Sequence, residues 1–367
     1  MKRVGAAVAA AATSLSLLGL QSAGLAAALA RPPGVVGRVQ SARPAVRKSK
    51  HLLGIDIWWK KHGANGSPER DRELAEYAAH VLHANAVDIS FPVFTHPTKF
   101  DSVWASRRFT PSPTELAGLI SECRTYRLSV SLRPLLNIDT KSYNWRGQIR
   151  PKNLHAFFRA YAHALKPYLV LARTEHVPTF VYLSELWYQS TQKADVGDWR
   201  YLVRLMRRWY HGKLEYSSSG DQYVRQTVRV PGYGDYTDAY WSAKLHWTAS
   251  EDELYMRWWM RLHNLSRSVL RRTVLQEVGI AAVYLGYWVP STVVSSHAKS
   301  KFLVMQRRWF AMVCHIVQHF DIKGLYFWTL EYSIDPFSVK KNNRWYDPTQ
   351  WVNRAGGREI ASCFAHV

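Results

Sequence analysis

From His51 onward the chain alternates short apolar runs with helical patterns, and this alternation constrains the fold more than any other feature. It predicts a parallel sheet covered by helices, because each helix returns the chain to the start of the next strand. Eight strands can be assigned, the number that a closed (β/α)8 barrel, or TIM barrel, requires. We therefore predict an α/β chain with a single barrel domain over residues 51–367. The expected strands are 52–58, 86–91, 128–133, 179–184, 213–217, 236–241, 272–276 and 324–328.

Capping and breaking residues predict where these elements begin and end. Pro92 and Pro134 are expected to end the second and third strands, and Asp198 and Ser250 to cap two helices. Between the fifth and sixth strands, residues 222–234 show no helical pattern. The expected helices are 70–82, 114–125, 154–172, 198–209, 251–270, 299–319 and 360–365.

Two glutamates, Glu185 and Glu277, each follow one of the apolar runs that read as buried strands. A carboxylate is costly at the end of a buried strand unless the site uses it. The two positions are 92 residues apart, which is about three βα units of roughly 30 residues. They would therefore lie on the fourth and seventh strands and face one another across the barrel mouth. Paired carboxylates in that setting are what cleavage of a glycosidic bond needs.

Four short motifs relate residues 51–367 to a known group of barrels. They are Gly54-Ile-Asp-Ile-Trp58, Ser184-Glu-Leu-Trp187, Gln276-Glu-Val-Gly-Ile280 and Gly324-Leu-Tyr-Phe-Trp328. In the order and spacing of these motifs, the chain resembles clan A of the retaining glycoside hydrolases. Within that clan it is most similar to glycoside hydrolase family 113. The resemblance implies hydrolysis of glycosidic bonds in a polysaccharide or oligosaccharide without a cofactor. A β-mannan-like chain is the first candidate substrate.

The resemblance also implies a role for each glutamate. Glu185 would be the acid/base, and Glu277 the nucleophile that forms a covalent glycosyl-enzyme. Retention requires carboxyl groups about 5–5.5 Å apart, whereas about 6.5–9.5 Å would indicate inversion. Apolar surroundings from Leu186 and Trp187 are expected to raise the pKa of Glu185. Glu277 is expected to stay ionised, held by hydrogen bonds from Arg133 or Tyr240.

Further residues at the strand ends are predicted to bind substrate. Asp56, buried in the first strand, would pair with a sugar hydroxyl or with a structural arginine. Ser184 stands where many clan members have an asparagine that binds the sugar 2-hydroxyl, although family 113 accepts a small hydroxyl residue there. Trp328 is the candidate platform beneath a sugar ring. The full predicted set is Asp56, Trp58, Arg133, Ser184, Trp187, Tyr240 and Trp328.

The N-terminal segment is typical of a protein exported from the cytoplasm. Residues 1–30 combine a basic start, an apolar stretch and small residues, and so predict a signal peptide, with a retained membrane anchor as the alternative. Residues 31–50, with three prolines, six basic residues and no acidic one, predict a flexible basic linker. No later apolar run is long enough to span a bilayer. We expect a secreted or cell-envelope-associated protein.

The net charge is +22, of which residues 1–50 carry eight positive charges and no negative one, leaving +14 for residues 51–367. A body with this charge would be attracted to an anionic cell-envelope polymer. No zinc-finger or RNA-binding signature accompanies the charge, so a nucleic-acid partner is not expected. A polyanion-binding surface protein is one alternative function, and a non-catalytic glycan-binding or envelope-associated barrel is another.

Three cysteines, Cys123, Cys314 and Cys363, allow at most one internal disulfide. Cys314 and Cys363 would fall on the last two outer helices, which are neighbours in a closed barrel, and are the pair we predict; three buried thiols are the alternative. No histidine falls in a spacing that suggests a metal centre. Phosphate-binding glycine loops and the serine-hydrolase elbow are also absent from the sequence.

Overall fold

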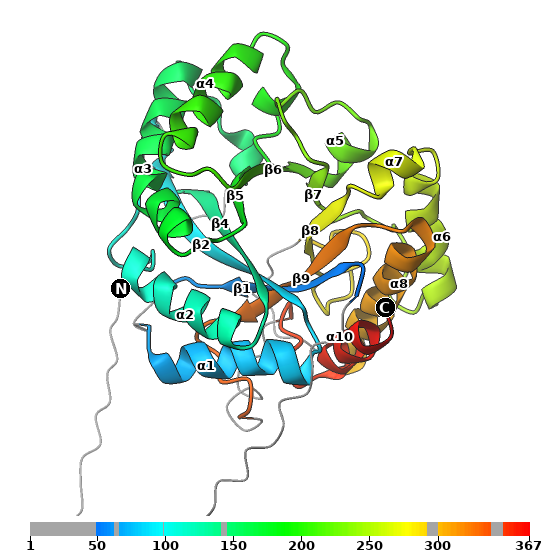
Figure 1. The fold of residues 1–367 in the computed structure, drawn as a ribbon. Coiled ribbons are helices and arrows are strands. Elements are labelled where there is room, and N and C mark those ends of the chain that lie inside the picture. The colour runs from blue at the N-terminus through cyan, green and yellow to red at the C-terminus, as the bar shows by residue number, and fades with distance from the viewer. Residues whose placement is uncertain (1–48, 62–65, 98, 141–144, 292–299, 339–347) are drawn as a thin grey trace, which may run out of the picture. The chain divides into compact units, whose positions relative to one another are not determined.

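Eight parallel strands form a closed ring at the centre of the computed structural model, which describes residues 49–61, 66–97, 99–140, 145–291, 300–338 and 348–367 (Figure 1). The pairing of the first and second strands closes the ring. The predicted (β/α)8 barrel is therefore confirmed. Its strands are β1 (Leu52–Trp58), β2 (Ala86–His96), β4 (Ser129–Ile138), β5 (Thr179–Ser184), β6 (Lys213–Ser219), β7 (Tyr236–Asp238), β8 (Val274–Val278) and β9 (Gly324–Glu331).

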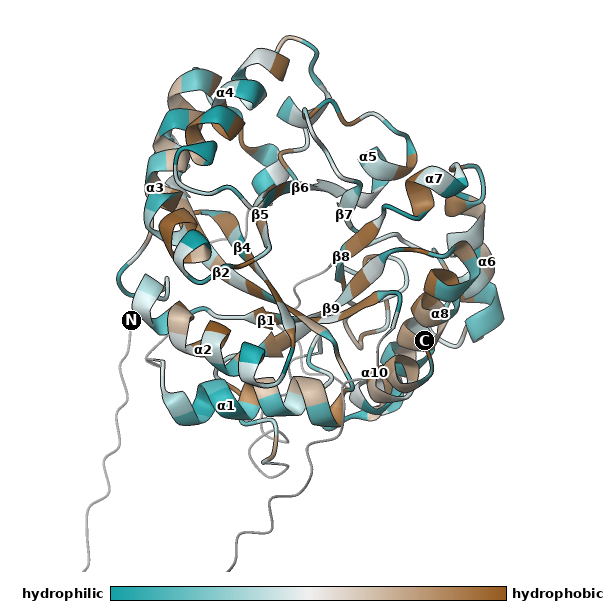
Figure 2. Cartoon of the chain, in the orientation of Figure 1, coloured by the Kyte–Doolittle hydropathy of each residue, from teal (hydrophilic) through white to brown (hydrophobic). Residues whose placement is uncertain are grey.

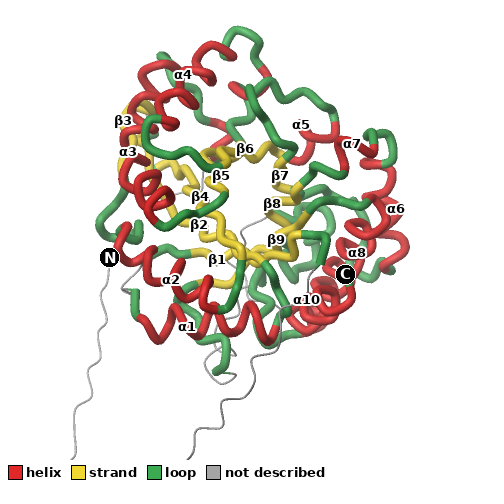
Figure 3. Tube along the Cα trace, viewed as in Figure 1, coloured by secondary structure: helices red, strands yellow, loops and turns green. Residues whose placement is uncertain are grey.

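Helices surround the ring of strands on the outside, as Figure 3 shows. Figure 2 shows hydrophobic residues along β8 and β9, whereas the outer helices carry both hydrophobic and hydrophilic residues. The helices are α1 (Pro68–Glu76, continued by a π-helical turn at Tyr77–Val81), α2 (Pro113–Thr125), α3 (Leu154–Thr174), α4 (Val196–Arg207), α5 (Gly220–Val224), α6 (Glu251–Leu262), α7 (Arg267–Leu270), α8 (Leu303–Phe320) and α10 (Ala355–His366). In the part of the chain that the structure describes, no helix has the length and apolar character to cross a bilayer.

Several strand ends differ from the prediction, and Glu277, expected just after a strand, lies within β8. Pro92 and Pro134 do not end β2 and β4, which stay paired beyond both prolines. A proline can remain in a strand where the sheet does not need its missing N–H. The extended end of β2 also pairs with an unpredicted antiparallel strand, β3 (Lys99–Trp104), which lies outside the ring.

Most helix bounds also shift by a few residues, and two helix predictions were wrong. The predicted helix 251–270 is two helices, α6 and α7, although Ser250 does cap the first of them. Helix α4 begins after Asp195, so the prediction that Asp198 caps it was wrong. Between β6 and β7 the chain forms only the five-residue α5, in agreement with the missing helical pattern there.

The interior of the barrel is filled by side chains from several strands. One buried cluster consists of Ala86, Val181, Tyr236, Val274 and Tyr326. Gly54 in β1 lies against the ring of Tyr326, so closely that a Cβ atom at this position would overlap the ring. The barrel is therefore a packed core, and a binding cavity has to form at one of its ends.

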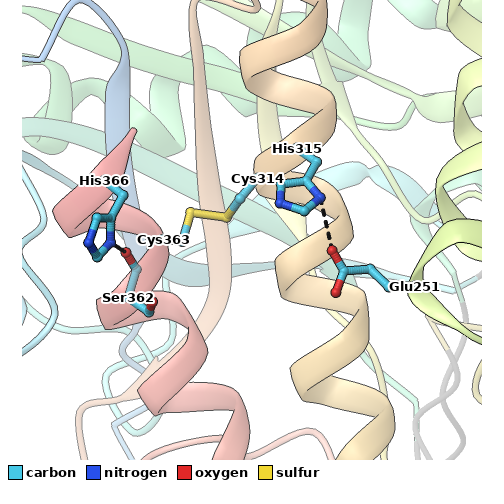
Figure 4. Close-up of a disulfide and its surroundings, with 6 residues drawn as sticks. All are labelled: Glu251, Cys314, His315, Ser362, Cys363 and His366. Carbon is cyan, nitrogen blue, oxygen red and sulfur yellow. Dashed lines mark hydrogen bonds and ion pairs between the residues drawn. A yellow bond between two sulfur atoms is a disulfide. The ribbon is translucent and has the colours of Figure 1, made fainter.

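Cys314 on α8 and Cys363 on α10 form a disulfide, which confirms the predicted pairing (Figure 4). The two Cα atoms lie 6.1 Å apart, within the usual range for a disulfide. Cys123 is a buried free thiol. The predicted signal peptide (1–30) and the predicted linker up to residue 48 lie outside the described residues.

Candidate active site

A cavity of about 980 Å³ opens at the carboxyl ends of the barrel strands. In (β/α)8 enzymes this is the end where the catalytic site forms. Six of the predicted site residues line the cavity: Trp58, Glu185, Trp187, Tyr240, Glu277 and Trp328. Across the residues with described positions, no cluster of histidine, cysteine or acidic side chains has a geometry that could hold a metal ion.

Glu277 is held through both of its carboxylate oxygens. The Tyr240 hydroxyl donates a hydrogen bond of 2.6 Å to Oε1, and Arg133 Nη2 lies 2.7 Å from Oε2. Burial, followed by the neighbouring Glu277 charge, raises the pKa of Tyr240 well above its usual value, so the hydroxyl keeps the proton that it donates. Both predicted partners of Glu277 therefore contact it, and they fix the direction of its carboxylate.

Arg133 connects Glu277 to a buried polar network beneath the cavity. Its Nη2 donates to Asp238 Oδ2 at 2.7 Å, and its Nε donates to Ser184 Oγ at 3.1 Å. Its Nη1 lies 3.7 Å from Asp56 Oδ2. Burial raises the pKa of both Asp56 and Asp238, while the charge of Arg133 lowers it. A single arginine thus holds several buried acids in place.

Three predicted substrate-binding residues belong to this network and do not line the cavity. Asp56 and Arg133 are fully buried, and Ser184 is almost so. Asp56 pairs with Arg133 and Ser90 rather than with a sugar hydroxyl. The Ser184 hydroxyl is engaged by Arg133 below the cavity surface. The structure therefore gives all three a supporting position: Asp56 takes the arginine alternative, Arg133 contacts Glu277, and none of the three lines the cavity.

Glu185 follows directly after β5 and has a left-handed backbone, with φ of 53°. Its N–H donates to the Ser217 carbonyl at 2.8 Å, which holds this unusual conformation. Its Oε2 accepts hydrogen bonds from Trp145 Nε1 at 3.0 Å and from Arg146 Nη1 at 2.9 Å. Burial raises the pKa of Glu185, Arg146 opposes that shift, and Glu277 adds to it. The direction agrees with the sequence prediction.

Aromatic side chains form much of the remaining cavity wall. The rings of Trp58 and Trp328 lie 5.6 Å apart at an angle of 45°. Trp351, fully buried, donates to the Trp328 carbonyl at 2.9 Å and so supports the backbone there. Trp187 is 42% exposed at the opening. Flat apolar surfaces of this kind suit the faces of sugar rings.

Sequence reasoning missed three residues that the structure places at this site: Trp145, Arg146 and Asp238. Asp238 ends the sixth barrel strand, so the rule that singled out Glu185 also applies to it. Trp145 and Arg146 lie in a connecting segment with neither strand nor helix periodicity. No sequence pattern indicated that these two residues contact Glu185.

Several solved structures have a similar fold over most of this chain. A GH113 β-1,4-mannanase superposes with a TM-score of 0.69 at 15% identity, covering 86% of this chain and 99% of that one. The GH113 β-mannanase AaManA from Alicyclobacillus acidocaldarius gives a TM-score of 0.67 at 19% identity, covering 86% and 97%. A β-glucuronidase from Ruminococcus gnavus gives 0.54 at 7% identity, covering 86% and 49%. At these identities the likeness shows the fold alone.

Comparison with curated protein sequences gives no significant match. The family model for Glycoside Hydrolase Family 113, however, matches residues 57–350, which is most of the chain and includes both glutamates and the whole cavity-forming end of the barrel. This chain therefore belongs to glycoside hydrolase family 113 and is a glycoside hydrolase by family.

Proposed function

We propose that this protein is an exported, retaining glycoside hydrolase that cleaves β-glycosidic bonds of a polysaccharide or oligosaccharide through Glu185 and Glu277. One observation carries the proposal: the two carboxylates line the same cavity but have different surroundings. Glu185 is a half-buried acid whose pKa is raised by desolvation, whereas Glu277 is held by a cation and a hydroxyl. Pairs of acids with such contrasting environments divide into a proton donor and a nucleophile.

In the proposed first step, Glu277 attacks the anomeric carbon while Glu185 donates its proton to the departing glycosidic oxygen. The bond from the anomeric carbon to that oxygen breaks, and a covalent glycosyl-enzyme forms on Glu277. In the second step Glu185 removes a proton from water, whose oxygen then displaces Glu277. The product keeps the original anomeric configuration because it has been inverted twice.

The substrate and the location are part of the same proposal. Family membership supports a carbohydrate substrate, and the names of the similar mannanase structures make a β-mannan the first polymer to test. The Cys314–Cys363 disulfide supports an oxidising compartment outside the cytoplasm. The excess of basic residues supports association with an anionic envelope polymer, which would weaken as salt is added.

The test is a glycan panel that includes β-mannan, with wild type beside Glu185→Gln and Glu277→Gln. We expect Glu277→Gln to lower kcat by at least about 10³-fold with the fold intact. NMR should show that the first-formed product has the same anomeric configuration as the substrate. Glu215→Gln is the matched control, because Glu215 is a buried strand glutamate whose contacts are with Lys213 and Gly234.

Full activity in Glu277→Gln would remove this residue from the mechanism, and first release of the opposite anomer would replace retention by inversion. Binding of a glycan without hydrolysis by wild type would identify the chain as the non-catalytic barrel. Tight, salt-sensitive binding to a polyanion that survives loss of both glutamates would favour the polyanion-binding alternative.

A further inference from the structure

The segment that follows β4 is held firmly against the barrel. Its 3-10 turn, η2 (Arg146–Gln148), is closed by the Gln148 N–H, which donates to the Trp145 carbonyl at 2.9 Å. Arg146 Nε donates to the carbonyl of Leu136 in β4 at 3.2 Å. Gln189 donates to the Ile149 carbonyl at 2.9 Å, which joins the segment to the loop after β5. These contacts fix the segment on both sides of Arg146.

Trp145 is held by a second feature of the same segment. A Cβ atom at position 147 would lie about 2.5 Å from three atoms of the Trp145 ring, and Gly147 has none. The indole therefore packs directly over the Gly147 backbone. Any larger residue at position 147 would displace the ring and the N–H that it presents.

Both Trp145 and Arg146 direct their donors to the same oxygen, Oε2 of Glu185. Oε1 has no hydrogen-bond partner among the described residues, so the two oxygens are chemically distinct. We propose that Trp145 and Arg146 are positioning residues for the acid/base: they fix Glu185 through Oε2 and leave Oε1 to exchange the proton with the substrate. This inference rests on the proposed function of Glu185.

The two donors also act on the charge of Glu185 during catalysis. When Glu185 gives up its proton it becomes a carboxylate, and hydrogen bonds from a cation and an indole stabilise that form. They lower the pKa of Glu185, against the upward effect of burial. Among the described residues, the charged and titratable groups that interact with Glu185 include Arg146 from η2, Arg133 from β4, Tyr216 from β6, Asp238 from β7 and Glu277 from β8.

The experiment measures kcat/KM against pH for Arg146→Met, Arg146→Lys and Trp145→Phe with two aryl β-mannosides. Phenyl β-mannoside needs protonation of its leaving group, whereas dinitrophenyl β-mannoside does not. Glu185 must be protonated to donate, so a higher pKa extends activity to higher pH. We expect Arg146→Met and Trp145→Phe to move the alkaline limb of the kcat/KM profile to higher pH. In Arg146→Lys the limb should lie closer to that of wild type.

The leaving-group dependence separates positioning from general damage. We expect Arg146→Met to lose roughly 10- to 100-fold in kcat/KM on the phenyl substrate and less than about 3-fold on the dinitrophenyl substrate. Arg150→Met is the matched control. Arg150 lies in the same segment and donates to the carbonyls of Gly147 and Ile149, and its described hydrogen bonds do not include Glu185.

An unmoved alkaline limb, equal losses on both substrates, or an equal shift in Arg150→Met would each overturn the inference. A carbon-13 NMR titration of the Glu185 carboxyl group, assigned with Glu185→Gln, gives a readout that needs no turnover. It should show a higher pKa in Arg146→Met than in wild type, and an unchanged pKa would also overturn the inference. If wild type cleaves no glycan, the proposed function fails while this titration still decides the role of Arg146.

Discussion

Arg133 Nη2 lies 2.7 Å from Oε2 of Glu277 and at the same distance from Oδ2 of Asp238, so one nitrogen is shared by two carboxylates. The guanidinium is fully buried, which removes competing water from both contacts. Because an arginine fork is rigid, its position sets the direction of the carboxylate that faces the cavity. The position of Glu277, the proposed nucleophile, is therefore set by a residue of the packed barrel interior.

Replacing Arg133 should damage stability and activity together. Arg133→Met leaves Asp56, Asp238 and Glu277 without their shared cation, and breaking a buried pair in this way costs about 3–5 kcal/mol. We expect urea unfolding to show that loss, and kcat to fall by at least about 10²-fold at a temperature where the variant is folded. Arg133→Lys should recover part of the stability but little activity, since an ammonium cannot reproduce the fork. Wild-type stability in Arg133→Met would contradict the central position of this residue.

Tyr240→Phe removes the 2.6 Å hydrogen bond to Glu277 and keeps the ring. A hydrogen bond to a charged group is worth about 1.5–3 kcal/mol, so kcat should fall roughly 10- to 100-fold with little change in KM. Tyr236→Phe is a suitable control, because Tyr236 begins β7, the strand that leads into Tyr240, and its hydroxyl contacts Lys213 rather than the cavity. Equal effects of the two substitutions would show that the loss reflects strand stability and not the contact with Glu277.

Much of the fold could be read from the sequence because hydrophobic periodicity reports the faces that a strand or helix buries. Strands β1 and β5 have the predicted bounds. Prolines misled the prediction at β2 and β4, since the identity of a residue does not say whether the sheet needs its N–H. The split of helix 251–270 has a local signal that the prediction did not use: Ser266 caps α7, and its hydroxyl accepts a hydrogen bond from the Val269 N–H.

The candidate site was predictable mainly where its residues lie near the carboxyl ends of barrel strands. Glu185, Glu277, Tyr240 and Trp328 come from such positions and line the cavity. For Asp56 the sequence indicated a buried acid that needs a partner but could not choose between a sugar and an arginine. That choice depends on three-dimensional distances, as does the approach of Arg146 to Glu185 from a segment 39 residues earlier in the chain.

The Cys314–Cys363 disulfide should contribute to stability and leave catalysis unchanged. It joins α8 and α10, which lie outside the ring of strands, and closes a loop with a sequence separation of 49. Loop-closure entropy gives a contribution of about 4 kcal/mol at most. We expect the Cys314→Ala/Cys363→Ala double variant to unfold at a lower urea concentration than wild type. At about room temperature, where the barrel stays folded, its kcat should equal that of wild type. Dithiothreitol should destabilise Cys123→Ala as it does wild type, and leave the double variant unaffected.

Asp71 on α1 should make stability fall as the pH rises through the weakly acidic range. It is buried, accepts a hydrogen bond of 2.7 Å from the Tyr332 hydroxyl, and has a pKa raised by burial from 3.8 to about 6. The folded protein therefore holds this proton more tightly than the unfolded chain. The resulting stability is fully present below about pH 4 and is lost as the pH rises through about 6.

Asp71→Asn keeps the shape and removes the titration. We expect its free energy of unfolding to exceed that of wild type above pH 6 by about 3 kcal/mol at most, with the difference shrinking as the pH falls toward 4. Urea unfolding across this range measures it. Asp321→Asn is the contrasting control. Lys50 lowers the pKa of Asp321, so the stability that Asp321 contributes is lost only as the pH falls, in the opposite direction to Asp71. A pH dependence that is the same in Asp71→Asn and wild type would show that this buried carboxyl does not titrate in the folded protein.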